Sequence, residues 1–228
     1  KPWISVDYDP AAQSGLEGPA GGLGYTWNSV TINGVITNLL NSDGVPTTVG
    51  CYENGDLLDA WPITPEFSIL RGAITTFGWN NPHTLIITGL RPERIYNIYI
   101  AGYYPNEAGC FGSYVTTNST TSPMTNMIFN GTGNWHPPYT EGINDQWLQG
   151  TNYCRFLNVQ PEINGVIRFA MQGSTYVHSV DGTSNNCRAI VSGFQIVDVA
   201  PIPGIGIDNI SGFVVVTNAT QYIHGTNT

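Results

Sequence analysis

Six aromatic residues in segments rich in Asn, Gly and Pro could bind sugars. They are Trp61, Trp79, Tyr103, Tyr104, Trp135 and Trp147. Sugar binding needs aromatic ring faces beside polar donors and acceptors, and Asn80, Asn81, Asn106 and Asn134 lie close to them in the sequence. The alternative is that these rings only pack over the open ends of the fold.

Residues that could catalyse a reaction are present, but their spacing does not favour catalysis. The chain has no G-x-S-x-G, H-E-x-x-H or P-loop sequence. His178, Ser179 and Asp181 are neighbours along the chain, whereas a catalytic triad is defined by geometry in space. Carboxylates that could act in pairs on glycosides are Asp7, Asp9, Glu53, Asp56 and Asp59. We interpret them as solvated surface groups and predict that the protein is not an enzyme.

Cysteines and glycosylation sequons favour an extracellular or cell-surface location. Cys51, Cys110, Cys154 and Cys187 are far apart and lack the spacing of a zinc site. An even number suits two disulfides in a secreted protein, with three possible pairings. N-x-S/T sequons, which are candidate glycosylation sites, begin at Asn118, Asn130, Asn209 and Asn218.

The composition excludes two classes of partner. The 228 residues carry a net charge of −9, whereas nucleic-acid binding needs clustered Lys and Arg. No apolar run is long enough to span a membrane. Hydrophobic residues make up 41% and charged residues only 10%, so a sizeable core is expected beneath a surface of Asn, Thr, Ser and Gly.

The element that must position these groups is a strand within residues 94–104. Tyr96, Ile98 and Ile100 would share one face, and Tyr99 would lie on the other. Apolar and β-branched residues on both faces indicate a central strand. Other short strands are separated by turn-forming residues, with no amphipathic helix, and this pattern predicts an all-β, two-sheet antiparallel sandwich. Further strands are expected near residues 3–8, 84–88, 110–116, 126–129, 153–159, 165–171 and 188–199.

Several segments resemble the malectin-like and galactose-binding-like jelly-roll domains of secreted bacterial proteins. These are Ile4-Ser-Val-Asp-Tyr8, Trp27-Asn28, Asn41-Ser-Asp-Gly44, Gly89-Leu-Arg-Pro-Glu-Arg-Ile-Tyr-Asn-Ile-Tyr-Ile-Ala-Gly102, Tyr153-Cys-Arg-Phe and Ser192-Gly-Phe-Gln-Ile-Val197. The resemblance covers about residues 3 to 198 and implies a jelly roll that binds carbohydrate. No cofactor is expected, except that jelly rolls of this kind often hold one structural calcium ion, to which Asp7, Asp9 and Asp43 could contribute.

The C-terminal segment falls outside this resemblance. We therefore expect a sandwich domain over residues 1–199, with a Pro/Gly linker and a terminal strand over residues 200–228. The strand, near residues 212–219, is uncharged and contains Phe213, Val214, Val215, Val216 and Thr217. Such a run is a liability if it stays exposed. It either adds to the same sandwich or pairs with the next copy of the chain.

Two functions follow from these observations. The first is a non-catalytic, secreted structural protein whose copies join head to tail by β-strand addition into an extracellular filament or surface layer. The alternative is a carbohydrate-binding module that uses the six aromatic residues. The expected partners are other copies of the chain in the first case and glycans in the second.

Overall fold

In a computed structural model of the chain, most of the described residues form β-strands. The described residues are 3–8, 16, 18–21, 25–30, 35–53, 56–58, 73–75, 83–102, 108–122, 124–130, 147–173, 175–177, 184–186, 189–201, 213–218 and 221–226. The strands are β1 (Ile4–Asp7), β2 (Asn28–Ser29), β3 (Gly50–Glu53), β4 (Asp56–Leu58), β5 (Ala73–Thr75), β6 (His83–Thr88), β7 (Arg94–Ala101), β8 (Ala108–Thr116), β9 (Met124–Asn130), β10 (Tyr153–Val159), β11 (Ile167–Gly173), β12 (Thr175–Val177), β13 (Ser184–Asn186), β14 (Ile190–Val191), β15 (Gly193–Pro201), β16 (Phe213–Asn218) and β17 (Gln221–Thr226). Within these residues there is no helix, and so no helix that could cross a membrane.

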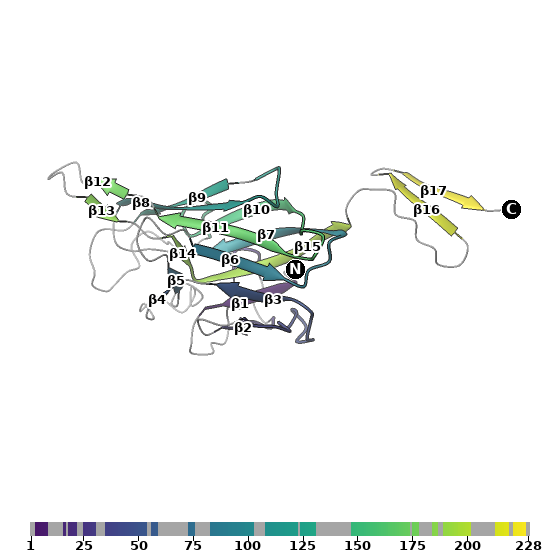
Figure 1. The fold of residues 1–228 in the computed structure, drawn as a ribbon, viewed down its shortest axis with the longest axis horizontal. Coiled ribbons are helices and arrows are strands. Elements are labelled where there is room, and N and C mark those ends of the chain that lie inside the picture. Colours follow the sequence, from purple (N-terminus) through teal and green to yellow (C-terminus); the bar gives the residue numbers. More distant parts are fainter. Residues whose placement is uncertain are drawn as a thin grey trace.

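Two five-stranded sheets pack face to face, as Figure 1 shows. The first sheet has the order β10-β7-β15-β1-β2, and the second has the order β3-β6-β11-β8-β9. Neighbouring strands are antiparallel except β1 and β2, which run parallel. The all-β sandwich predicted from the sequence is therefore confirmed.

Strand β7 occupies the central position that its sequence predicted. It pairs with β10 on one side and β15 on the other. Tyr96, Ile98 and Ile100 are fully buried between the sheets, while Asn97 and Tyr99 on the outer face are half-buried. The alternation arises because successive side chains of a strand point to opposite faces.

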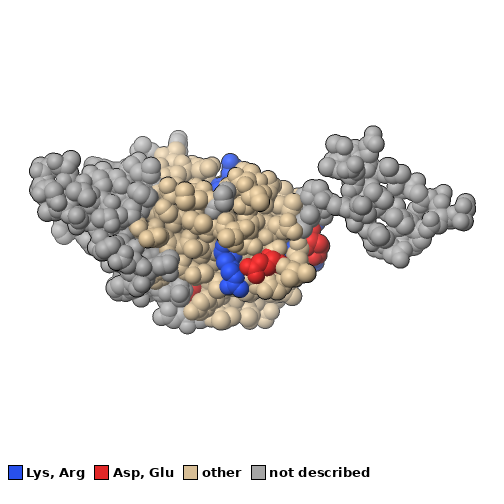
Figure 2. Space-filling model, turned by 45° about the horizontal axis from the view of Figure 1, so that its top comes forward, with Lys and Arg blue, Asp and Glu red and all other residues tan. Residues whose placement is uncertain are grey.

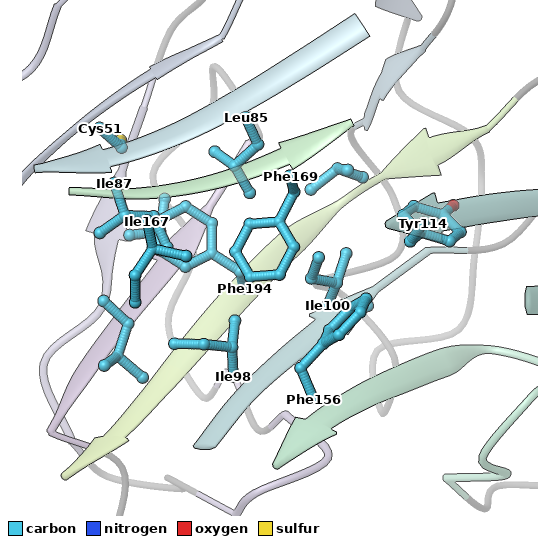
Figure 3. Packing of buried hydrophobic residues seen from close by; sticks show 14 of the residues in the cluster. Cys51, Leu85, Ile87, Ile98, Ile100, Tyr114, Phe156, Ile167, Phe169 and Phe194 are labelled. Carbon is cyan, nitrogen blue, oxygen red and sulfur yellow. The ribbon is translucent and has the colours of Figure 1, made fainter. Parts of the chain in front are cut away.

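Aromatic and aliphatic side chains from both sheets interlock in the core (Figure 3). Phe156 of β10 contacts Phe169 of β11 with ring centroids 4.9 Å apart, which joins the first sheet directly to the second. Tyr114 of β8 reaches across to β14, where its hydroxyl donates to the Ile190 carbonyl and accepts from the Ile190 amide. The sheets are thus held by apolar packing with a few specific polar contacts.

The sandwich has two different ends. Tight connections join β6 to β7, β8 to β9 and β10 to β11 at one end, which we call the turn end. At the other end β7 finishes opposite the beginnings of β10 and β15, with Ala101 level with Tyr153 and Gly193. The longer connections 54–82, 131–152 and 174–189 begin and end there, as does the short connection 102–107. We call this the loop end.

Part of the outer face of the first sheet is covered by the segment around Gly18–Gly21. Gln195 of β15 is fully buried and ties this segment to the sheet. Its Nε2 donates to the Gly21 carbonyl (2.8 Å) and to Ser5 Oγ (3.2 Å), and its Oε1 accepts from the Ala20 amide (2.9 Å). The segment covers β1 and β15, whereas the outer faces of β7 and β10 are half-buried.

The sequence prediction for residues 188–199 differs from the structure. We expected one long strand, but the chain changes sheets at Ser192. Ile190 and Val191 pair with β5, while β15 begins at Gly193 and pairs with β1 and β7. The Ser192 amide donates to the Ala101 carbonyl, and the Ser192 carbonyl accepts from the Tyr8 amide, so the junction is anchored on both sides.

The C-terminal strand expected over residues 212–219 is present as β16, but it pairs with a strand that the sequence analysis missed. β16 and β17 form an antiparallel two-stranded sheet, with Phe213 opposite Thr226 and Asn218 opposite Gln221. Among the described strands, neither β16 nor β17 belongs to a sandwich sheet.

Replacing Gln195 with Ala should lower the free energy of unfolding by about 2 kcal/mol, because it leaves the Ala20 amide without its acceptor and removes one of the two donors to the Gly21 carbonyl. The measurement is urea unfolding of the variant beside the wild type. Gln160→Ala is the control, since that side chain is exposed and should change stability by less than about 0.5 kcal/mol. Equal effects of the two substitutions would show that Gln195 does not hold the segment.

Candidate functional site

Three aromatic side chains form a row on the outer face of the first sheet. Tyr99 of β7 and Tyr153 of β10 have ring centroids 6.3 Å apart, and Trp147 meets Tyr153 edge-on, also at 6.3 Å. All three are half-buried. The outward direction of Tyr99 and Tyr153 follows from the strand alternation, because Ile98, Ile100 and Cys154 point into the core. Trp147 precedes β10, is placed by its contact with Tyr153, and also packs against the core cluster. We call these three residues the aromatic row.

A tight turn after Trp147 positions it against β10. The Leu148 amide donates to Asn152 Oδ1 (2.8 Å), and the Leu148 carbonyl accepts from the Thr151 and Asn152 amides. Asn152 is fully buried, and its carbonyl accepts from Gly102 at the end of β7. The turn therefore fixes Trp147 at the loop end of the sandwich.

Trp147 is the only one of the six predicted sugar-binding residues that lies within the described part of the chain. Trp61, Trp79, Tyr103, Tyr104 and Trp135 lie outside it. The connections that contain them, however, run from β3 to β6, from β7 to β8 and from β9 to β10. Each of these connections begins and ends at the loop end, where Trp147 lies.

The sequence analysis did not select Tyr99 and Tyr153 as site residues, because both belong to strands and were assigned to the fold. The signal that could have found them is the alternation itself. Tyr99 lies between two inward-facing isoleucines, and Tyr153 precedes the inward-facing Cys154. A tyrosine at an outward position of a central strand is available for contacts outside the core.

Charged side chains are sparse on the described surface. Figure 2 shows a mostly tan face with a few separate basic and acidic groups. Arg94 forms an ion pair with Asp198, and Arg168 forms one with Glu162. Arg155 lies directly opposite Tyr99 in the pairing of β10 with β7, on the same outer face as the aromatic row.

A second group of polar side chains lies inside the core at the loop end. Tyr8, Cys51 and Glu53 are buried and close enough to influence one another's ionisation, although Tyr8 and Glu53 form no hydrogen bond of normal length and angle within the described residues. Burial raises the pKa of Glu53 from 4.5 to about 8, against a smaller lowering by Tyr8. Burial likewise raises the pKa of Cys51 to about 12. Glu53 is therefore a neutral acid at pH 7.

Glu53 was expected to be a solvated carboxylate, and this expectation was wrong. It extends from β3 into the core and is 5% exposed. Glu53 lies two residues after Cys51 on β3, so both side chains face the core. Asp7 is also buried, on the outer side of the first sheet. Asp9, Asp59, His178, Ser179 and Asp181 lie outside the described residues, and the side chain of Asp56 is not described.

Two of the four cysteines do not form the expected disulfides. Cys51 and Cys154 are buried free thiols, located in the second and first sheets respectively. The prediction of two disulfides is therefore wrong for these two residues, since an even number of cysteines does not bring their side chains together. Cys187 lies outside the described residues, and the side chain of Cys110 is not described.

The calcium and glycosylation assignments stay predictions. Within the described residues, no group of three or more His, Cys, Asp or Glu side chains could hold a metal ion; Asp43 lies in an Asn41 turn, and Asp9 is outside the described part. Asn118 binds its neighbours, donating to the Gln160 carbonyl and accepting from the Arg168 amide. Asn209 lies outside the described residues, and the side chains of Asn130 and Asn218 are not described.

Comparison with known proteins assigns this chain to no family. No protein-family model matches the chain, and no curated protein matches it. Among solved structures, the chain is similar to TmCBM61, a carbohydrate-binding module in complex with β-1,4-galactotriose, with 12% sequence identity and a TM-score of 0.33. The match covers 65% of this chain and 88% of that one. At this level, the likeness assigns neither a family nor a function.

Replacing Glu53 with Gln should make stability less dependent on pH. A raised pKa means that the folded state binds the proton more tightly, so the stabilisation is complete below about pH 4.5 and is lost as pH rises to about 8. Between pH 5 and pH 8.5, the free energy of unfolding should fall by more in the wild type than in Glu53→Gln. The difference between the two losses should exceed about 1 kcal/mol. Urea unfolding at both pH values tests this; parallel pH profiles for the two proteins would contradict it.

Proposed function

We propose that the protein is a secreted, non-catalytic saccharide-binding module whose platform is the aromatic row at the loop end. One observation carries the proposal. The rings of Trp147, Tyr153 and Tyr99 form a row on the outer face of the first sheet. This row lies at the loop end, where the connections that contain the other five candidate aromatic residues begin and end. This observation supports carbohydrate binding, which was the alternative of the two functions that the sequence suggested.

The chemistry of the row suits a sugar. The pyranose ring has apolar C–H faces, which pack on aromatic rings, and hydroxyl groups around its edge, which need polar partners. Asn97 and Arg155 are outward-facing polar neighbours on the same two strands. A surface with few charges also avoids strong, unspecific attraction of ions.

Alanine substitution of Trp147 or Tyr153 should weaken saccharide binding by at least about fivefold, since removing a central aromatic contact typically costs more than 1 kcal/mol. Binding is measured on a glycan array and by pull-down with insoluble polysaccharides, then by calorimetry for each saccharide that binds. Tyr52→Ala is the matched control: Tyr52 is an exposed tyrosine in β3, on the second sheet, and its removal should leave binding unchanged.

The proposal is wrong if wild type binds no saccharide in either assay. It is also wrong if Tyr52→Ala weakens binding as much as Trp147→Ala does. Circular dichroism and thermal unfolding of each variant establish that the sandwich is intact.

A second candidate function is self-assembly through the C-terminal hairpin. Its support is that β16 and β17 pair only with each other among the described strands. An isolated two-stranded sheet is marginally stable in water, and its outer edges offer unpaired backbone groups to another strand. Pairing of this edge, from Phe213 to Thr217, with the next copy would join chains head to tail in a filament or surface layer.

Deleting residues 202–228 should then abolish polymerisation and leave a folded monomer. Light scattering and negative-stain electron microscopy compare the truncated and full-length proteins at equal concentration. Val215→Pro should reduce assembly without deletion, because proline removes a backbone donor from β16. Polymers of the truncated protein, or a full-length protein that remains monomeric, would exclude the hairpin as the connector.

A further inference from the structure

Arg155 is the charged residue nearest to the aromatic row in the sheet. It lies two residues after Tyr153 on β10 and directly opposite Tyr99 on β7. Cys154 and Phe156, its neighbours along the strand, are fully buried in the core, so Arg155 shares the outer face with the two tyrosines. Opposed and adjacent same-face residues of paired strands lie within contact distance of each other.

The guanidinium group of Arg155 lacks a partner within the described part of the chain. Its Nε is buried and makes no hydrogen bond, and no carboxylate among the described residues forms an ion pair with it. Arg94 and Arg168 differ in this respect: the Nε of Arg94 donates to Asp198 (2.9 Å), and that of Arg168 donates to Glu162 (3.2 Å). A partly buried arginine without an acceptor is costly, so an acceptor supplied by a ligand would stabilise it.

The nearest polar neighbours of Arg155 do not supply that acceptor. Asn97 lies further along the outer face of β7, and its Oδ1 accepts from the Asn158 amide (3.1 Å). Gln195, opposite Tyr99 on the other side of β7, is committed to the Gly18–Gly21 segment. A ligand that supplied an acceptor to Arg155 would therefore not compete with these neighbouring side chains.

We propose that Arg155 and the aromatic row form a subsite for a uronic acid, a sugar that carries a carboxylate. The rings of Tyr99 and Tyr153 contact the apolar face of the sugar, and the guanidinium binds its carboxylate. Arginine suits this role because its planar donors match the two oxygens of a carboxylate. The inference rests on the saccharide-binding function proposed above and specifies its substrate class.

The overall charge of the chain favours a single acidic sugar over a polyanion at this site. With 16 acidic residues against seven Lys and Arg, the chain repels densely charged polymers such as nucleic acids. One arginine beside a row of aromatic rings gives one charged contact and one stacking contact. Together they match a single uronate residue in an otherwise neutral saccharide.

The test compares acidic saccharides with their own methyl esters, which keep the sugar ring and lose only the charge. Oligosaccharides that carry a single galacturonate, glucuronate, mannuronate or guluronate residue among neutral sugars are titrated into the full chain by calorimetry. At least one acid should bind at least about tenfold more tightly than its ester, as expected for one charge-assisted hydrogen bond. Arg155→Gln should reduce this ratio to about one, while Arg168→Gln, on the second sheet, should leave it unchanged.

Wild type alone provides a further readout that needs no variant. Raising the salt concentration from 20 mM to 500 mM should weaken binding of the acid and leave binding of the ester unchanged. If neutral saccharides bind but no acid is preferred, or if Arg155→Gln keeps the preference, the uronate subsite is excluded and the saccharide-binding function stands. If no saccharide of either kind binds, both proposals are excluded.

Discussion

Side chains along β7, which pairs with β10 and β15, alternate between the core and the outer face of the sheet. This alternation is the constraint on which the rest of the structure depends. Every second residue of β7 must be buried between the two sheets, where Ile98 and Ile100 join the cluster around Phe156 and Phe169. The same constraint turns Tyr99 outward, towards Tyr153. The core and the candidate site are therefore opposite faces of one pair of strands, and neither face can shift register without the other.

The two ends of the sandwich differ in the connections that they hold. At the turn end, short connections tie the sheets together through side chains such as Asn118, which bridges the connection after β8 to Gln160, in the connection after β10, and to Arg168 in β11. At the loop end, three of the connections are longer, and their sequences contain aromatic residues. Antiparallel sandwiches gather the connections between their strands at the two ends, where a rigid scaffold holds them.

The sequence predicted the strands whose residue pattern is strongest and missed features that depend on distant partners. β7 was predicted because β-branched and aromatic residues dominate it, and β10 because a Pro/Asn/Gly turn separates it from the next strand. The division of residues 188–199 into β14 and β15 at Ser192 was missed, because it depends on hydrogen bonds that join Ser192 to Tyr8 and Ala101, which are distant in the sequence. Glu53 was misjudged, because its burial is set by the register of β3 on β6. Of the aromatic row, only Trp147 was predicted, since Tyr99 and Tyr153 were explained by the strands that contain them.

The central claim is that saccharides bind on the outer face of β7 and β10 at the loop end. The most direct measurement is an NMR titration of the ¹⁵N-labelled protein with a saccharide identified by the array, following the backbone amides and the Trp147 indole. The account predicts shifts confined to Trp147, Tyr99, Tyr153, Arg155 and the connections of the loop end. Shifts centred on the turn end, on the second sheet or on the C-terminal hairpin would contradict it.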